Sequence, residues 1–170
     1  MEVSLAYEYK REPLTPSEED RLVSTCSTFR ERLIVYTLLD CGLRESEFVG
    51  IKADNIQWQQ GTMVIWGKGD KRRVVPVSQR VKNLLQGGLI DIGARQVQRV
   101  VKNIAERAGI TKEVTPHVLR HTFAMRTLQK GVSIVALQRL LGHEDIRTTM
   151  IYLNMSNSQA IDEYQRKVGL

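Results

Sequence analysis

The chain has 170 residues, of which 42% are hydrophobic and 26% are charged, and its formal net charge is +6. These values suit one globular domain and exclude collagen-like, mucin-like and mostly disordered chains. No apolar run approaches the ~20 residues of a membrane span, and the N-terminus lacks the layout of a signal peptide. We therefore expect a cytoplasmic protein without a membrane contact, whose basic balance is compatible with binding nucleic acid.

Helix-start signals indicate where the folded domain begins. Residues 1–13 form a mixed polar arm or linker, and Thr15-Pro16-Ser17-Glu18 follows. This segment combines a capping threonine, a proline suited to the first helical position and a capping-box glutamate. The domain should therefore cover residues 14–170. A first helix is predicted to begin at Thr15-Pro16, and further helices are predicted over 28–39, 44–49, 81–85, 94–108, 115–129, 133–141, 146–153 and 158–168.

Between these helices the pattern changes to the alternation typical of strands. The β-rich runs are 55–58, 62–66 and 72–77, and Gln60-Gly61 and Gly67-Lys68-Gly69-Asp70 separate them as turns. Pro76 favours an edge position for the last strand, because proline cannot donate to a neighbouring strand. The predicted fold class is α+β, mostly helical, with a small three-stranded antiparallel sheet.

Several side chains could carry chemistry, although each has an ordinary structural explanation. Arg44 and Glu47 are three residues apart and suit a surface ion pair. Lys68 suits the polar tip of a hairpin. His143 follows a helix and would stabilise its C-terminus, and Tyr152 alone is most simply a core aromatic residue.

The segment from His117 to His121 is more informative. His117 and Arg120 lie on one face at the start of a helix, whose N-terminus attracts anions. A capped helix with solvated polar side chains would also account for them. A zinc site is disfavoured because Arg120 places a cation between the histidines, and Cys26 and Cys41 form no zinc motif. We expect no metal and no cofactor.

Together these residue types suit a site that acts on a phosphodiester. Guanidinium groups bind phosphate oxygens with paired hydrogen bonds, histidine and lysine transfer protons, and tyrosine supplies a nucleophilic oxygen. The sequence has no carboxylate cluster of the kind used in two-metal catalysis, so the arginines would stabilise the developing charge.

Five segments, in the family's order, resemble the tyrosine recombinases, also called the phage integrase family. They are Cys41–Glu47, Gly67–Arg73, Thr115–Ala124, Leu140–His143 and Thr148–Tyr152. The resemblance implies a mostly helical catalytic domain with a small sheet. It also implies site-specific cleavage and rejoining of DNA through a 3′-phosphotyrosine, with strand exchange that needs neither ATP nor metal.

The resemblance implies a role for each candidate residue. Arg44 and Arg120 would bind the scissile phosphate, Lys68 would protonate the leaving 5′ oxygen, His117 would transfer a proton, His143 would donate a hydrogen bond to the phosphate, Tyr152 would be the nucleophile and Glu47 would support the site. We therefore expect Arg120→Ala to fold normally and to lose DNA cleavage.

The family also suggests how DNA and other subunits are contacted. The partner would be double-stranded DNA, on which the chain would form a homotetramer. Free in solution, the chain could instead be a monomer. Members usually carry an N-terminal DNA-gripping domain, which we expect to be absent here. Candidates to face DNA are Arg95, Gln96, Gln98, Arg99 and Lys102, for which a solvated helix face is an equal explanation.

The C-terminal stripe of Ala160, Ile161, Tyr164 and Val168 could pack either on its own core or on a neighbouring subunit.

Two other functions also stay open. One is a type IB topoisomerase, which relaxes DNA without exchanging partners. The other is a catalytically silent DNA-binding regulatory module. The Leu140–His143 segment favours a recombinase over the first, and the presence of all six reacting residues argues against the second.

Overall fold

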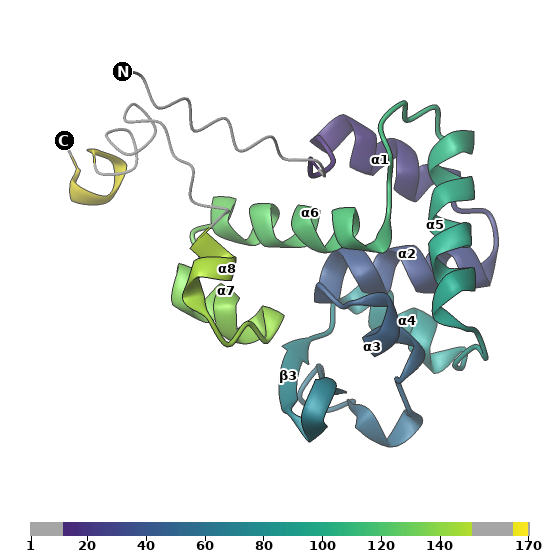
Figure 1. Cartoon of the computed structure of the whole chain (residues 1–170), viewed down its shortest axis with the longest axis horizontal. Helices are drawn as coiled ribbons and strands as arrows, with labels where there is room; N and C mark the ends of the chain where they lie inside the picture. The colour runs from purple at the N-terminus through teal and green to yellow at the C-terminus, as the bar shows by residue number, and fades with distance from the viewer. Residues whose placement is uncertain (1–11, 151–164, 170) are drawn as a thin grey trace.

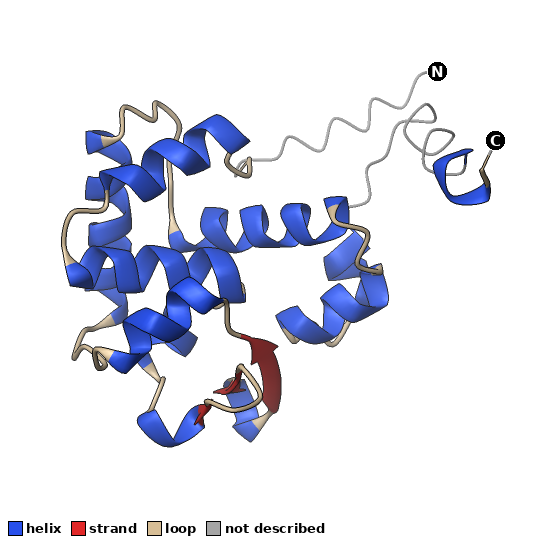
Figure 2. Ribbon diagram, turned by 180° about the vertical axis from the view of Figure 1, so that it is seen from behind, coloured by secondary structure: helices blue, strands red, loops and turns tan. Residues whose placement is uncertain are grey.

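A computed structural model of the chain describes residues 12–150 and 165–169 (Figures 1 and 2). The helices are α1 (Pro16–Thr25), α2 (Phe29–Cys41), α3 (Glu45–Val49), α4 (Gln79–Gln86), α5 (Ala94–Arg107), α6 (Pro116–Gln129), α7 (Ile134–Leu141) and α8 (Ile146–Met150). The strands are β1 (Ile56–Gln57), β2 (Thr62–Trp66) and β3 (Arg72–Pro76), and the 3-10 turns are η1 (Ala53–Asn55) and η2 (Lys68–Asp70). The expected α+β class, mostly helical with one small sheet, is confirmed.

The three strands form an antiparallel meander in the order β1-β2-β3. The predicted edge position of Pro76 is correct, because β3 is an outer strand. Side chains of Met63 and Val75, which are register partners, are buried against the helices. Arg73 is the partner of Ile65 and shares this inward face, so an arginine points toward the core side of the sheet.

The starts of the helices follow the predicted capping signals. Thr15 and Glu18 form the expected capping box at α1, and Thr115 with Pro116 begins α6. The backbone N–H of Leu14 donates to Oγ1 of Thr122 at 2.9 Å, which attaches the first folded residues to α6. The first described helix therefore begins where the capping signal predicts it. Of the helix predicted over 158–168, only 165–168 lie in the described ranges, and these are helical.

Helix α2 occupies the centre of the molecule and packs against α1, α3, α4, α5 and α6 (Figure 1). The sequence pattern predicts one apolar face through Phe29 and Leu33. Instead, seven of the thirteen residues of α2 are buried, while Phe29 is 39% exposed. A helix surrounded by others buries more than one stripe.

Two hydrophobic clusters meet along α6. Val118 and Leu119 belong to the main core, whereas Phe123 and Ala124 pack against Leu137 and Leu141 of α7 in a second cluster. Arg120 therefore lies where α6 passes from one cluster to the other. In the described ranges, no helix is long and apolar enough to cross a membrane.

Candidate active site

Arg120 is fixed at the point where two helices end. Its side chain is 2% exposed. Nη1 donates to the carbonyl oxygen of Gly42, which ends α2, at 2.7 Å, and Nη2 donates to that of Leu141, in the last turn of α7, at 2.6 Å. Carbonyls at helix C-termini lack partners within the helix and carry partial negative charge. The guanidinium group therefore binds the C-terminal ends of two helices at once.

These contacts change the prediction for Arg120→Ala, which the sequence alone suggested would fold normally. An alanine at this position would leave the carbonyls of Gly42 and Leu141 buried without the donor that they have now. Each such loss destabilises a fold by about 1–3 kcal/mol. The sequence could not reveal this cost, because the two carbonyls come from helices far from Arg120 in the chain.

The carboxylate of Glu47 lies close to several arginines of the site. It accepts from the backbone N–H of Arg44 at 2.8 Å and from Nη1 of Arg44 at 3.1 Å. Nη1 of Arg120 lies 3.6 Å from Oε2 of Glu47. The predicted ion pair of Arg44 with Glu47 is confirmed, but it is not a surface pair, because the side chain of Glu47 is only 3% exposed.

Arg73 is a site residue to which the sequence analysis gave no role. Its Nη1 and Nη2 donate to the two carboxylate oxygens of Glu47 at 2.5 and 2.9 Å, and its Nε donates to the carbonyl of Leu140 at 2.7 Å. The strand alternation offered a signal. Arg73 falls on the same face as the buried Val75, and a buried arginine requires a partner.

His143 has a defined tautomer in this arrangement. Its Nε2 lies 3.2 Å from Nη2 of Arg120, and its Nδ1 lies 2.9 Å from Oγ1 of Thr149. Arginine only donates hydrogen bonds, so Nε2 accepts and Nδ1 carries the proton donated to Thr149. Thr149 is fully buried and was not predicted as a site residue.

The surroundings of His143 disfavour its charged form. Burial is the largest cause, and the positive charges of Arg120, Arg44 and Arg73 act in the same direction. Together they lower the pKa of His143 to about 4, with a smaller contribution from His117. Several cations therefore act on one imidazole, which is the electrostatic environment of an anion-binding site.

A cleft of about 1170 Å³ opens beside these residues. Its walls include the start of α3, the β2–β3 hairpin and the turn after α7, and they contain Arg44, Lys68, Arg73, Arg139 and His143. Lys68 is exposed in the hairpin. An ion pair of Lys71 with Glu144 joins the hairpin to the loop that follows His143.

The comparisons with known proteins identify the family. Residues 12–159 match the model of the phage integrase family. The chain belongs to the phage integrase family. It is 33% identical over 180 residues to the tyrosine recombinase XerD of Lacticaseibacillus casei, and 36% identical over 165 residues to the tyrosine recombinase XerA of Thermococcus kodakarensis. These alignments cover 90% and 84% of the chain, but 61% and 58% of the relatives, so the chain spans about 60% of the length of these two relatives.

Solved structures agree with the family assignment. A crystal structure of XerA recombinase superposes with a TM-score of 0.79 at 29% identity, over 91% of this chain and 64% of that one. A XerH site-specific recombinase, bound to palindromic difH substrate in a post-cleavage complex, has the same fold with a TM-score of 0.78 at 22% identity, over 91% of this chain and 53% of that one. The tyrosine recombinase catalytic fold is therefore shown for this chain.

The structure brings Arg44, Glu47, Arg120 and His143 together, with Lys68 at the same cleft. His117 lies at the start of α6 with its ring 4.4 Å from that of His121, edge to face. Tyr152 lies outside the described residues, two positions beyond the last residue of α8. Within residues 12–150 and 165–169, no three or more metal-ligating side chains lie close enough together to hold a metal ion.

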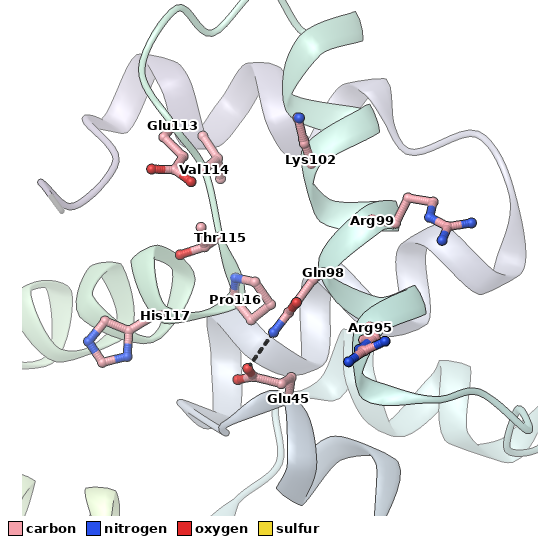
Figure 3. A pocket seen from close by; sticks show the side chains of 10 residues that line it. All are labelled: Glu45, Arg95, Gln98, Arg99, Lys102, Glu113, Val114, Thr115, Pro116 and His117. Atoms are coloured by element: carbon pink, nitrogen blue, oxygen red, sulfur yellow. Dashed lines mark hydrogen bonds between the residues drawn. The ribbon is translucent and has the colours of Figure 1, made fainter.

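A second pocket of about 450 Å³ lies between α5 and the start of α6 (Figure 3). Gln98 of α5 reaches across it and donates to Glu45 of α3 at 2.8 Å (Figure 3). The other predicted DNA-facing side chains that line it are Arg95, Arg99 and Lys102, and His117 lies at its edge. Arg44 lines the cleft and its neighbour Glu45 lines this pocket, so both hollows have a wall at the start of α3.

Gln96 is placed differently from the other predicted DNA-facing residues. Its side-chain oxygen accepts from the backbone N–H of Gly93 at 3.1 Å, at the N-terminus of α5. Gln96 is not among the residues that line the pocket. Its contact stabilises the first turn of the helix, and the predicted contact of this exposed side chain with DNA stays a prediction.

Proposed function

We propose that this chain is the catalytic part of a site-specific DNA recombinase, with residues 14–170 as its catalytic domain. It would cleave and rejoin double-stranded DNA through a 3′-phosphotyrosine on Tyr152. The observation that carries the proposal is that Arg44 and His143 line one cleft and that the buried Arg120 contacts His143. Membership of the phage integrase family and the likeness to tyrosine recombinases support the same activity.

The proposed chemistry is an in-line exchange of one phosphodiester for another. The Tyr152 oxygen forms a bond to phosphorus, and the bond from phosphorus to the 5′ oxygen breaks. Negative charge develops on the non-bridging oxygens, where Arg44 and Arg120 would stabilise it. Lys68, on the exposed hairpin, would donate a proton to the departing 5′ oxygen, and His117 would accept the proton that the Tyr152 hydroxyl loses.

Burial of Arg120 supports this assignment. A cation held by two helix ends and a nearby carboxylate needs little reorganisation when charge develops in the cleft. His143 is neutral before substrate binds, and a phosphate at its Nε2 would favour protonation of that nitrogen. His143 could then donate a hydrogen bond to the phosphate while Nδ1 keeps its contact with Thr149.

The DNA duplex is proposed to extend from the cleft over α5. Arg95, Arg99 and Lys102 would contact phosphates, which dominate the affinity of proteins for DNA. Gln98 is placed for a hydrogen bond to a base or a phosphate. The proposed location is the cytoplasm, where this substrate lies, at the nucleoid or, for a viral protein, in the host cell.

A homotetramer on two DNA sites is the proposed assembly. Within the described part of the C-terminal stripe, Val168 is 55% exposed. A single exposed valine is ordinary on a protein surface, so the tetramer is proposed from the likeness to tyrosine recombinases and both ways of packing the stripe stay open.

The proposal is tested with a nicked suicide duplex that loses its short 5′ fragment on cleavage. Wild-type chain should form an SDS-resistant DNA adduct without metal or ATP, and Tyr152→Phe should form none. Binding of DNA by the wild type without any adduct on this substrate would favour a silent regulatory module. Relaxation of supercoiled plasmid with no exchange between two labelled duplexes would favour a type IB topoisomerase.

A further inference from the structure

We propose that Arg73 is a positioning residue that fixes both the Glu47 carboxylate and the last turn of α7, and thereby orients the phosphate-binding groups. The inference rests on the proposed function and goes beyond the catalytic set that the family resemblance implies. Arg73 itself would not touch the phosphate. It would act through Glu47 and through the turn that carries His143.

The guanidinium group of Arg73 donates three hydrogen bonds, to Glu47 and to the end of α7. Two donate to separate oxygens of Glu47, and Nε donates to the carbonyl of Leu140. Its side chain is 11% exposed and that of Glu47 is 3% exposed, so water competes little with these bonds. A planar guanidinium group can make this set of contacts, whereas the single ammonium group of a lysine cannot reproduce it.

The ion pair of Arg73 with Glu47 keeps Arg44 and Arg120 available to bind the phosphate. Burial opposes ionisation of Glu47, but hydrogen bonds and charge from Arg73, aided by the charge of Arg120, hold the pKa of its carboxyl below the ordinary value. Without Arg73, a buried carboxylate would draw Arg44 and Arg120 more strongly toward itself. Their guanidinium groups would then be displaced from the phosphate.

Arg73 also shapes the end of α7. The carbonyls of Leu140 and Leu141 are bound by Arg73 and Arg120, respectively. Gly142 follows, and a Cβ added there would lie 3.0 Å from Cδ of Arg73. The arginine thus packs against the turn that presents His143. Arg73 lies on β3, the strand that follows the turn carrying Lys68, and its side chain connects this strand to Glu47 and to the helix end before His143.

The first experiment compares Arg73→Lys and Arg73→Gln with the wild type on the nicked suicide duplex. We expect single-turnover cleavage at saturating protein to slow by about 100-fold, the scale of a displacement of about 1 Å in a catalytic group. DNA affinity should change little, because the proposed phosphate contacts of Arg95, Arg99 and Lys102 on α5 do not depend on Arg73. Arg30→Gln removes the same charge from an exposed position near the far end of α2 and should cleave at the wild-type rate.

A double-mutant cycle separates positioning from a general structural effect. Because Arg73 acts in part through Glu47, the variant that combines Glu47→Gln with Arg73→Gln should lose less than the product of the two single losses. Additive losses would overturn the proposal, as would a wild-type cleavage rate in Arg73→Lys. Loss of the folded state in Arg73→Lys, measured by circular dichroism, would also overturn it, because Arg73 would then be needed for folding itself.

The two proposals fail in different ways. An inactive wild-type chain would contradict the proposed function. An active wild type with fully active Arg73 variants would contradict only the positioning role.

Discussion

Nη2 of Arg120 lies 3.2 Å from Nε2 of His143 and also donates to the carbonyl of Leu141. The guanidinium group therefore fixes the imidazole and the helix end that precedes it. Because arginine stays protonated, the contact also disfavours a charge on His143. A phosphate bound beside Arg120 and His143 would instead favour the protonated imidazole, so DNA binding should be accompanied by uptake of a proton.

His143 should titrate with a pKa of about 4 in the free protein and with a higher pKa when an anion occupies the cleft. The chain has three histidines, so ¹H–¹⁵N NMR of the imidazoles can follow each of them. Addition of a non-cleavable DNA duplex should raise the pKa of His143 and make binding tighter as the pH falls from 7 toward 5. An unchanged pKa in the complex would show that no phosphate lies beside this ring.

The same shift makes fold stability depend on pH. The folded-state pKa of His143 lies below its ordinary value of 6.5, so the unfolded chain binds a proton in this range that the folded chain does not. Stability from this group is therefore present above about pH 6.5 and is lost progressively toward pH 4. The wild type should lose more unfolding free energy between pH 7 and 4.5 than His143→Gln does. Equal losses would contradict the assignment.

Arg120→Ala should be both unstable and inactive. Loss of the donors to Gly42 and Leu141 should reduce the unfolding free energy by about 1–3 kcal/mol for each carbonyl, and loss of the charge should slow cleavage by about 10²–10³-fold. Urea denaturation and the suicide-duplex assay measure the two effects separately. Arg120→Lys keeps the charge and should be less destabilised than Arg120→Ala. Wild-type stability in Arg120→Ala would contradict the structural role.

Gly42→Ala should destabilise the fold much more than Gly61→Ala. Both glycines have positive φ, 65° and 64° respectively. An alanine Cβ at 42 would lie 2.3 Å from Cδ1 of Phe123, whereas nothing lies within 4 Å at 61. Backbone strain costs about 1–2 kcal/mol at either position, and overpacking adds about 1–3 kcal/mol at 42 alone. Equal urea midpoints for the two variants would show that Phe123 moves aside without cost.

The α5 surface can be tested by the salt dependence of DNA binding. Arg99→Gln should reduce the slope of log affinity against log salt by about 0.9, the value for one phosphate contact. Gln96→Ala should leave the slope unchanged, since glutamine is uncharged and neutralises no phosphate. Fluorescence anisotropy at several salt concentrations measures both. An unchanged slope in Arg99→Gln would remove that residue from the proposed interface.

Much of the fold could be predicted because its signals are local. Thr15-Pro16 and Thr115-Pro116 mark helix starts through short-range capping, and the alternation around Met63 and Val75 marks strands. The meander followed from turn residues between consecutive strands. Such features depend on neighbours within about four residues, so a single sequence contains them.

The arrangement of the candidate site depends on distant contacts, and the sequence alone left it open. Arg120 binds Gly42, which is 78 positions away, and Arg73 binds Leu140, which is 67 positions away. The burial of Glu47 likewise arises from packing, so its pairing with Arg44 resembled a common surface ion pair. Thr149 forms its hydrogen bond with His143 only because the chain turns between α7 and α8. These contacts define how the site is held, whereas the motifs defined which residues form it.

The most direct test of the proposed recombinase chemistry is to locate the covalent bond to DNA. Tryptic digestion of the trapped adduct should yield the peptide of residues 148–166, which contains both Tyr152 and Tyr164. Fragmentation by mass spectrometry should place a nucleotide on the oxygen of Tyr152, joined through its 3′ phosphate. A nucleotide on Tyr164 or on any other residue, or a linkage through a 5′ phosphate, would contradict the proposed mechanism.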